Sequence, residues 1–153
     1  MEKIELKQFE ALIKDETNTL AMLCNATAFL KQITPDINWL GFYFFKNREL
    51  VLGPFQGKVA CSHLNLNQGV CAKCFNDNYY LYVPDVHDFS GHIACDSASN
   101  SELVIPLNVN HQEIGVLDID SPIIERFKDE DIRFFLQIVE ILENVLNKKN
   151  ISK

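Results

Sequence analysis

Apolar residues recur at helical spacing at both ends of this 153-residue chain and in strand-like runs between them. One helical stripe covers residues 2–13, and a second runs from Leu20 to Leu30 before Pro35 ends it. Near the other end, a sustained stripe from Ile132 to Leu146 predicts one long helix. The chain is therefore expected to begin and end in amphipathic helices.

The middle of the chain has the pattern of an antiparallel sheet. Two pairs of apolar runs are each joined by a short polar turn, around Asn47 and around His111, which is typical of β-hairpins. Two shorter runs lie between these hairpins. The predicted strands cover residues 39–45, 50–52, 59–66, 79–83, 103–109 and 114–119.

Helices at both ends of an antiparallel sheet predict an α+β domain in which the terminal helices cover one face. Residues 69–75 predict one further short helix. Residues 84–100 show no clear period and predict a long ordered loop over the other face, a type of segment that often carries function. No repeat or Pro/Gly/Ser-rich linker divides the sequence, so we expect a single domain over residues 1–153, with its core at about 16–147.

The charge balance restricts the class of partner. The chain has 14 Lys and Arg against 21 Asp and Glu, a formal net charge of −7, and no basic stripe. This argues against nucleic acid and anionic membranes as partners. Its apolar runs are too short to span a bilayer, and its charged N-terminus is unlike a secretion signal. We expect a cytoplasmic protein with reduced thiols.

Five cysteines cannot all pair within one chain, so some thiols are expected to be free. Cys24 lies on the apolar stripe of the second predicted helix, and we expect it to be buried and inert. Cys95 fits that role poorly, because it lies in a polar segment where nearby His92 can favour the thiolate, although Asp96 opposes this. Burial as an inert thiol is the alternative for every cysteine.

Cys71 and Cys74 have C-x-x-C spacing, and with Cys61, Cys95 or a histidine they can complete a tetrahedral zinc site. We favour no metal, because structural zinc sites usually contain two such pairs and this one falls in an apparent short helix. Redox pairing in the manner of thioredoxin also lacks its usual βαβ context.

Asp118 and Asp120 are expected on one face of a strand, because side chains alternate along it. Two carboxyl groups so close raise the pKa of one of them, which can then stay protonated and act as a general acid. A solvated strand end is the alternative interpretation.

Glu102 joins this pair only in one of two registers. A two-residue turn at residues 110–111 pairs Glu102 with Ile119 and points it away from the two aspartates. One extra loop residue instead pairs Glu102 with Asp120 and gathers three acids. The sequence leaves this choice open.

Trp39 and Tyr43 lie four residues apart on one strand and therefore share a face, where they can line a site for a small apolar or cationic group. Core packing is the plainer interpretation. Motifs for phosphate-binding loops, serine hydrolases and zinc proteases are absent from the sequence.

A series of short blocks appears in order along the chain. They are NWLGFY at 38–43, LGPFQGK at 52–58 followed by Ala60 and Cys61, GVC at 69–71, VPDVH at 83–87, GHIACDSAS at 91–99, Ser101-Glu102, and IGVLDIDSP at 114–122. In these blocks the chain resembles the free methionine-(R)-sulfoxide reductases, which are single GAF-domain enzymes.

The resemblance implies a GAF-like fold and a reaction in which free L-methionine-(R)-S-oxide is reduced to methionine. It implies that Cys95 is the nucleophile, that Cys61 is the resolving thiol and that Cys71 is a further redox-active partner. Thioredoxin is the implied electron source, with no bound cofactor or metal. Such chemistry passes through a sulfenic acid and an intramolecular disulfide.

The resemblance also assigns the substrate-binding residues. Glu102, Asp118 and Asp120 match the acids that hold the sulfoxide, and Trp39 with Tyr43 match aromatic residues beside it. A carboxylic acid with a raised pKa can protonate the sulfoxide oxygen while a thiolate attacks the sulfur.

The chain departs from the family after the GVC block, where small residues are replaced by Ala72, Lys73 and Cys74. Lys73 can lower the pKa of a neighbouring thiol. We expect Cys74 to be packed in the helix, with a part in the resolving step as the alternative. A non-catalytic GAF-type ligand-binding or redox-sensing module is the alternative function, and the amphipathic terminal helices suggest a homodimer.

Overall fold

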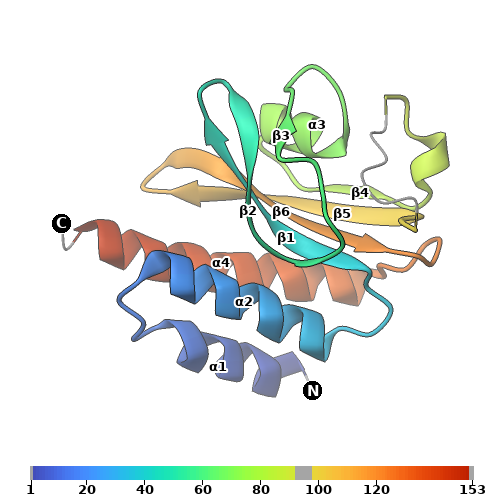
Figure 1. Cartoon of the computed structure of the whole chain (residues 1–153). Coiled ribbons are helices and arrows are strands. Elements are labelled where there is room, and N and C mark those ends of the chain that lie inside the picture. The colour runs from blue at the N-terminus through green and yellow to red at the C-terminus, as the bar shows by residue number, and fades with distance from the viewer. Residues whose placement is uncertain (1, 92–97, 152–153) are drawn as a thin grey trace.

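Six antiparallel strands form the sheet at the centre of the fold (Figure 1). The computed structural model describes residues 2–91 and 98–151. The helices are α1 (Glu2–Ile13), α2 (Thr19–Ile33), α3 (Val70–Asp77) and α4 (Asp129–Ile151), with a 3₁₀ turn η1 (Val86–Asp88). The strands are β1 (Trp39–Lys46), β2 (Glu49–Gly57), β3 (His63–Leu64), β4 (Leu81–Val83), β5 (Ser101–Val109) and β6 (Gln112–Ser121).

The strand order is β3-β2-β1-β6-β5-β4, so β1 and β6 are neighbours at the centre of the sheet although they come from opposite halves of the chain. Their register places Trp39 opposite Asp120 and Tyr43 opposite Val116. This long-range pairing brings the aromatic residues of β1 beside the acidic end of β6.

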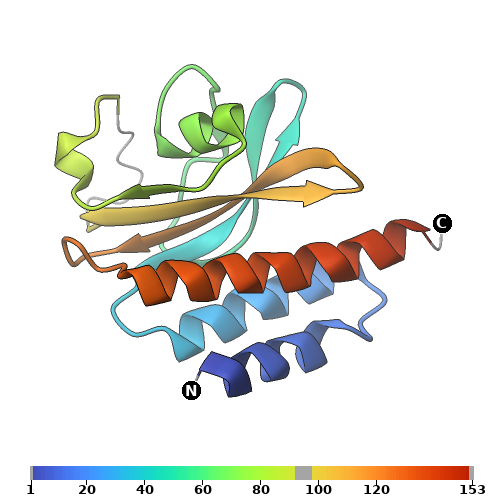
Figure 2. The same cartoon turned by 180° about the vertical axis from the view of Figure 1, so that it is seen from behind.

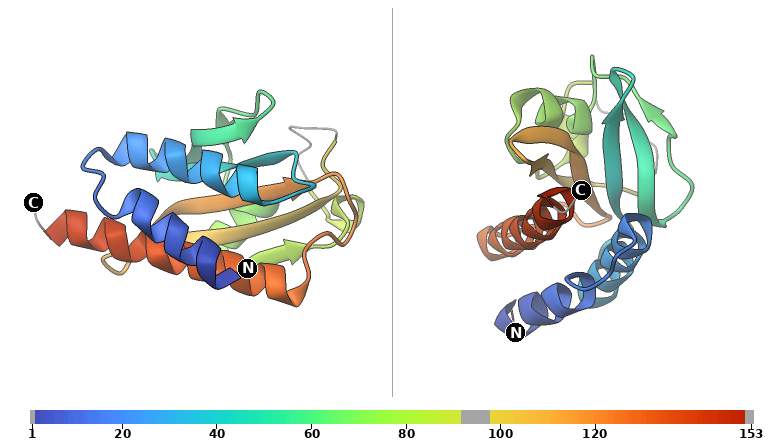
Figure 3. Two further views of the ribbon diagram at one scale, coloured as in Figure 1. Left: turned by 90° about the horizontal axis from the view of Figure 1, so that it is seen from below. Right: turned by 90° about the vertical axis from the view of Figure 1, so that its left-hand side faces the viewer.

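Helices α1, α2 and α4 all lie on one face of the sheet (Figures 2 and 3). Helices α2 and α4 pack on the strands, and α1 packs against both of these helices. Because side chains alternate along a strand, every second residue of β1, β5 and β6 points into this layer. The core includes Phe9, Ile13, Leu30, Leu40, Phe42, Leu103, Ile105, Leu107, Leu117, Ile119, Phe135 and Ile138. The predicted α+β architecture, with the terminal helices on one face, is confirmed.

The other face of the sheet carries α3 and the long connections around it (Figure 1). A second apolar cluster forms here from Trp39, Tyr43, Val104 and Val116 with residues of α3. By the same alternation, β5 and β6 present their acidic residues on this face. These acidic and aromatic residues are therefore separated from the main core by the thickness of the sheet.

Polar side chains cap the predicted helices at their observed ends. The Asn18 side chain accepts a hydrogen bond from the Ala21 N–H at 2.9 Å, and Asp131 accepts one from the Lys128 N–H at 2.9 Å. Acidic residues in the first turn of α4 also complement the helix dipole.

Cys24 is exposed, so the prediction that it is buried is wrong. The buried face of α2 is formed by Met22, Leu23, Ala26 and Leu30. At about 100° per residue, Cys24 is turned away from that face.

The prediction of one strand over residues 59–66 is also wrong in extent, because only His63 and Leu64 pair with β2. Strand β2 is longer than predicted. Its register against β1 shifts between Gly41 and Tyr43, which allows the strand to continue through Pro54. No helix in the part of the chain that the structure describes is long and apolar enough to cross a membrane.

Candidate active site

A bulge in β6 settles the register that the sequence leaves open. The β5–β6 turn has two residues, Asn110 and His111, both with the positive φ of a tight hairpin. The register shifts by one beside Leu107, which leaves Ile114 as an extra residue in β6. The turn therefore has two residues, as in the first predicted alternative. The bulge nevertheless places Glu102 opposite Asp120, as in the second.

The bulge lies where β6 passes very close to β1. A Cβ added to Gly115 would come within 2.2 Å of the Tyr43 carbonyl oxygen, so this position requires glycine. Gly115 directly follows the bulged residue Ile114 and pairs with Phe44 of β1. The position of Glu102, near one end of the hairpin, thus depends on a local irregularity near the other end.

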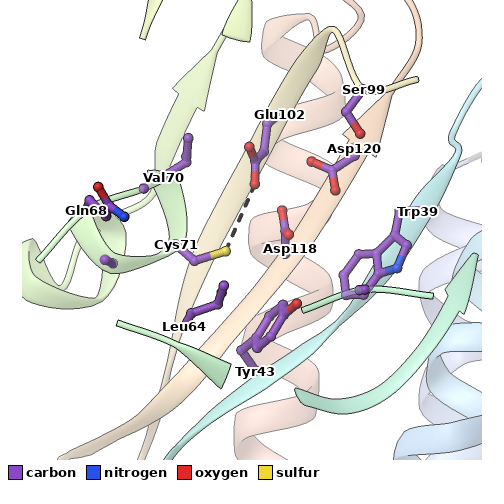
Figure 4. Close-up of a pocket in the computed structure, with 13 residues that line it drawn as sticks. Trp39, Tyr43, Leu64, Gln68, Val70, Cys71, Ser99, Glu102, Asp118 and Asp120 are labelled. Atoms are coloured by element: carbon purple, nitrogen blue, oxygen red, sulfur yellow. Dashed lines mark hydrogen bonds between the residues drawn. The ribbon is translucent and has the colours of Figure 1, made fainter. Parts of the chain in front are cut away.

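The three acids line a pocket between the sheet and α3 (Figure 4). The cavity volume is about 50 Å³, enough for a small group and a few water molecules. Its walls are formed by Trp39, Tyr43, Ala60, Leu64, Gln68, Gly69, Val70, Cys71, Ala72, Ser99, Glu102, Asp118 and Asp120. The carboxyl groups of Glu102 and Asp118 point toward the Cys71 sulfur, and the aromatic rings form the opposite wall (Figure 4).

Burial changes the protonation of these acids. Glu102 is 5% exposed and Asp118 is 6% exposed. The pKa of Glu102 is raised well above its usual range by burial and by the charge of Asp120. The pKa of Asp118 is raised likewise by burial and by the charge of Glu102. Burial therefore favours the protonated form of Glu102 and Asp118, and a carboxylic acid in that form can donate a proton to a ligand oxygen.

Cys71 is the described thiol that faces these acids. It lies in the first turn of α3, and its Sγ is 4.0 Å from Oε2 of Glu102. The pKa of this thiol is raised by burial and by the negative charges of Asp118 and Glu102. Cys71 therefore rests as a thiol rather than as a thiolate.

The aromatic wall is held rigidly in place. The ring centroids of Trp39 and Tyr43 are 5.9 Å apart in a stacked arrangement, and Phe55 stacks on the other side of Trp39 at 5.3 Å. Trp39 donates a hydrogen bond to the Lys58 carbonyl at 3.2 Å, and the Tyr43 hydroxyl donates one to the Cys61 carbonyl at 2.9 Å. Both rings belong to the second apolar cluster and also line the pocket, so core packing and a position at the pocket wall coexist.

The remaining cysteines differ in state. Cys61 is disulfide-bonded, whereas Cys24, Cys71 and Cys74 carry free thiols. Cys74 is buried in α3 as expected, and its pKa is raised by burial and by Glu113. Lys73 instead pairs with Asp77 at 3.1 Å on the exposed side of the helix. The predicted nucleophile Cys95, with His92 and Asp96, lies outside the described residues.

The pocket also contains residues that the sequence did not single out. Ser99 is buried, lines the cavity and accepts a hydrogen bond from the Asn38 side chain at 3.0 Å. Both residues lie within the family-like blocks, which is the signal that points to them. As for metal ligands, the donor atoms of Cys71, Glu102 and Asp118 lie within 4.8 Å of one another. Cys74 is not part of this group.

Comparison with known proteins shows the family to which the chain belongs. The GAF domain family matches residues 9–146. The free methionine-R-sulfoxide reductase of Escherichia coli strain K12 is 50% identical over 147 residues, which cover 96% of this chain and 89% of that protein.

Solved structures extend the similarity to three dimensions. The free methionine-R-sulfoxide reductase of Neisseria meningitidis, solved in complex with its substrate, has a TM-score of 0.93 at 36% identity, covering 99% of this chain and 92% of that chain. The reduced form of the Staphylococcus aureus enzyme has a TM-score of 0.91 at 45% identity, covering 95% and 94%. The chain therefore belongs to the GAF-domain family and, within it, to the free methionine-R-sulfoxide reductases, which are oxidoreductases.

Proposed function

We propose that this protein reduces free L-methionine-(R)-S-oxide to L-methionine with its own thiols. The observation that carries the proposal is the group of buried carboxyl groups of Glu102, Asp118 and Asp120, which face an aromatic wall across a small pocket. Sulfoxide reduction needs a proton on the departing oxygen, and a carboxylic acid with a raised pKa can supply it. The names of close relatives support the same substrate.

In the proposed reaction, the Cys95 thiolate attacks the sulfoxide sulfur while a pocket acid protonates the oxygen. The hydroxyl group then moves from the substrate sulfur to the Cys95 sulfur, as the substrate S–O bond and the transient bond between the two sulfurs break. Methionine leaves with its sulfur reduced by two electrons, and Cys95 becomes a sulfenic acid. Trp39 and Tyr43 pack against the methyl and methylene groups of the substrate. Placement of Cys95 at the centre of this step rests on the resemblance of the block at residues 91–99.

A second thiol then condenses with the sulfenic acid, releasing water and forming a disulfide. The disulfide-bonded state of Cys61 and the free thiol of Cys71 support Cys61 in this first resolving step. Cys71 then serves as a later exchange partner. We further propose that thioredoxin reduces the disulfide in the cytoplasm, that no bound cofactor takes part, and that the protein acts as a homodimer.

The lining of the pocket supports a free amino acid as substrate. The site lies between α3 and the sheet and is walled by side chains of both. Asp120, whose charge helps to raise the pKa of Glu102, can provide negative charge for the ammonium group that a free amino acid carries and an internal residue lacks. Peptide-bound methionine sulfoxide, which lacks this ammonium group, is expected to be a poor substrate.

The proposal is tested by incubating the reduced protein with racemic free methionine sulfoxide and a thioredoxin system. About half of the sulfoxide is expected to be consumed, all of it the R epimer. Cys95→Ser abolishes the activity, whereas Cys24→Ser, which alters an exposed thiol on α2, leaves it unchanged. If the intact protein binds the sulfoxide without converting it, a non-catalytic ligand-binding module becomes the better account.

A further inference from the structure

Three donors that suit a metal ion converge in the pocket from three different elements. They are the Cys71 thiol on α3, the Glu102 carboxyl group on β5 and the Asp118 carboxyl group on β6 (Figure 4). Their donor atoms all lie within 4.8 Å of one another. The distance between Sγ of Cys71 and Oε2 of Glu102 is 4.0 Å.

In the part of the chain that the structure describes, the surroundings of this group carry no positive charge that would oppose a cation once the ligands release their protons. Cys71, Glu102 and Asp118 are each at least nine-tenths buried. The described residues that line the pocket include no Lys, Arg or His. In addition, Oδ1 of Asp118 is buried and has no hydrogen-bond partner among the described residues. A buried oxygen of this kind is stabilised by a positively charged ligand.

We propose that the reduced protein binds one divalent cation of borderline softness, Zn²⁺, through Cys71, Glu102 and Asp118. Zinc accepts thiolate and carboxylate ligands together, and three protein ligands leave a fourth position for water. Magnesium and calcium are disfavoured, because they require six or more oxygen ligands and do not select a thiolate.

The geometry needs only a small adjustment to hold this ion. Around a tetrahedral zinc with ordinary bond lengths, the ligand atoms lie about 3.4–3.6 Å apart. The donors of the pocket therefore approach one another by roughly 1 Å on binding, which side-chain rotation provides. The bonds that form are Zn–S and Zn–O, and the protons of the ligating groups pass to the solvent.

Zinc at this position competes with the proposed substrate, because Glu102 and Asp118 cannot bind the ion and the sulfoxide oxygen together. It also holds Cys71 as a ligand, so that this thiol is withheld from disulfide exchange. With its thiols reduced and zinc bound, the pocket is blocked, and a chelator that removes the zinc opens it again. This consequence rests on the proposed function, whereas the binding of zinc does not.

Binding is tested on the full-length protein after reduction with a phosphine and removal of metals, by anaerobic titration with Co²⁺ and then Zn²⁺. Co²⁺ is expected to give a thiolate-to-cobalt absorption band at one equivalent, and Zn²⁺ to abolish it. Cys71→Ser removes the band and weakens zinc binding by at least about tenfold. Asp118→Asn and Glu102→Gln keep the band and weaken binding.

Two thiols outside the donor group provide matched controls. Cys74→Ser alters a buried thiol on the same helix, and Cys24→Ser alters an exposed thiol on α2. Both variants are expected to keep the band and the affinity. Circular dichroism of each variant shows whether it is folded. If Cys71→Ser does not fold, the weaker binding expected of the near-isosteric Glu102→Gln variant provides the test.

The proposal is overturned if the intact protein shows no thiolate band, or if the band survives Cys71→Ser. The activity measurement is separate. Zinc is expected to inhibit sulfoxide reduction competitively with the substrate, and a chelator to restore the rate. If the protein lacks reductase activity but binds zinc as described, only the proposed function fails. If zinc binds elsewhere while turnover is normal, only this inference fails.

Discussion

Glu102 on β5 lies directly opposite Asp120 on β6, although the turn that joins these strands has only two residues. A regular two-residue hairpin would pair Glu102 with Ile119 instead and turn its side chain into the helical layer. The extra residue Ile114 corrects the register before the strands reach the pocket. One bulge thereby decides whether the pocket contains two acids or three.

The bulge makes Gly115 sensitive to substitution. Gly115→Ala is expected to destabilise the fold by roughly 1–3 kcal/mol or more, because its Cβ would lie 2.2 Å from a backbone oxygen of β1. Denaturant unfolding measures this loss. Gly91→Ala is the control, since the nearest described atom to its Cβ is 3.8 Å away and the expected cost is that of a positive φ. Equal stability of Gly115→Ala and the parent chain would contradict the register described here.

The buried acids Glu102 and Asp118 are expected to support activity without stabilising the fold. Asp118→Asn and Glu102→Gln remove a buried acid without changing the shape of the pocket, and each is expected to lower kcat by about 10²-fold or more. Their melting temperatures should be unchanged or higher, because a neutral amide avoids the cost of either charging a buried carboxyl group or keeping it protonated above its usual pKa. Steady-state kinetics and thermal unfolding check the two parts together. Full activity in both variants would remove the acids from the mechanism.

Stability should depend on pH in a direction set by these acids. In the unfolded chain, Glu102 and Asp118 lose their protons near pH 4, as carboxyl groups in water ordinarily do. In the folded chain, burial raises the pKa of both groups, so the folded state retains protons that the unfolded state has lost. Their contribution to the free energy of unfolding is therefore full at low pH and declines as the pH rises above about 4.

Urea unfolding between about pH 5 and about pH 8 measures this dependence. The double variant with Asp118→Asn and Glu102→Gln should show a flatter decline than the parent chain. Burial raises the pKa of Glu113 to about 7. Glu113 therefore also lowers the free energy of unfolding as the pH rises, and this contribution ends near pH 7. An identical slope for the parent chain and the double variant would show that the two acids ionise normally.

The two aromatic residues should act on substrate binding rather than on the chemical step. Trp39→Leu removes the stacked ring between Tyr43 and Phe55 and is expected to raise KM several-fold more than it lowers kcat. Tyr43→Phe keeps the wall but loses the hydrogen bond to the Cys61 carbonyl, at a cost of about 1 kcal/mol in stability. A fall in kcat with unchanged KM for Trp39→Leu would place this ring in the reaction step instead.

The helices and their layer were predictable because each apolar stripe lies within one segment of the chain and extends over several turns. The stripes that define α1, α2 and α4 repeat over several turns, and their caps follow from short-range hydrogen bonds. Cys24 shows the limit of such a stripe, because a position at the margin of the buried face cannot be assigned without the partner surface.

The site was predictable only in part, since its geometry depends on long-range pairing. The presence of Asp118 and Asp120 on one face follows from alternation alone. The position of Glu102 depends on a bulge in β6, and the turn sequence does not indicate that bulge. Ser99 lies at the pocket, where it is hydrogen-bonded to Asn38 from a distant part of the chain. The family-like blocks did indicate Glu102, because the resemblance assigns all three acids together and does not depend on predicting the register.

The most direct test is a single turnover without an external reductant. The fully reduced protein is mixed with excess free L-methionine-(R)-S-oxide, and methionine and remaining thiols are counted. The account predicts about one methionine per chain, formed with the loss of about two thiols, and no methionine from Cys95→Ser. Absence of methionine from the intact, fully reduced protein would contradict the claim that these thiols and acids reduce the sulfoxide.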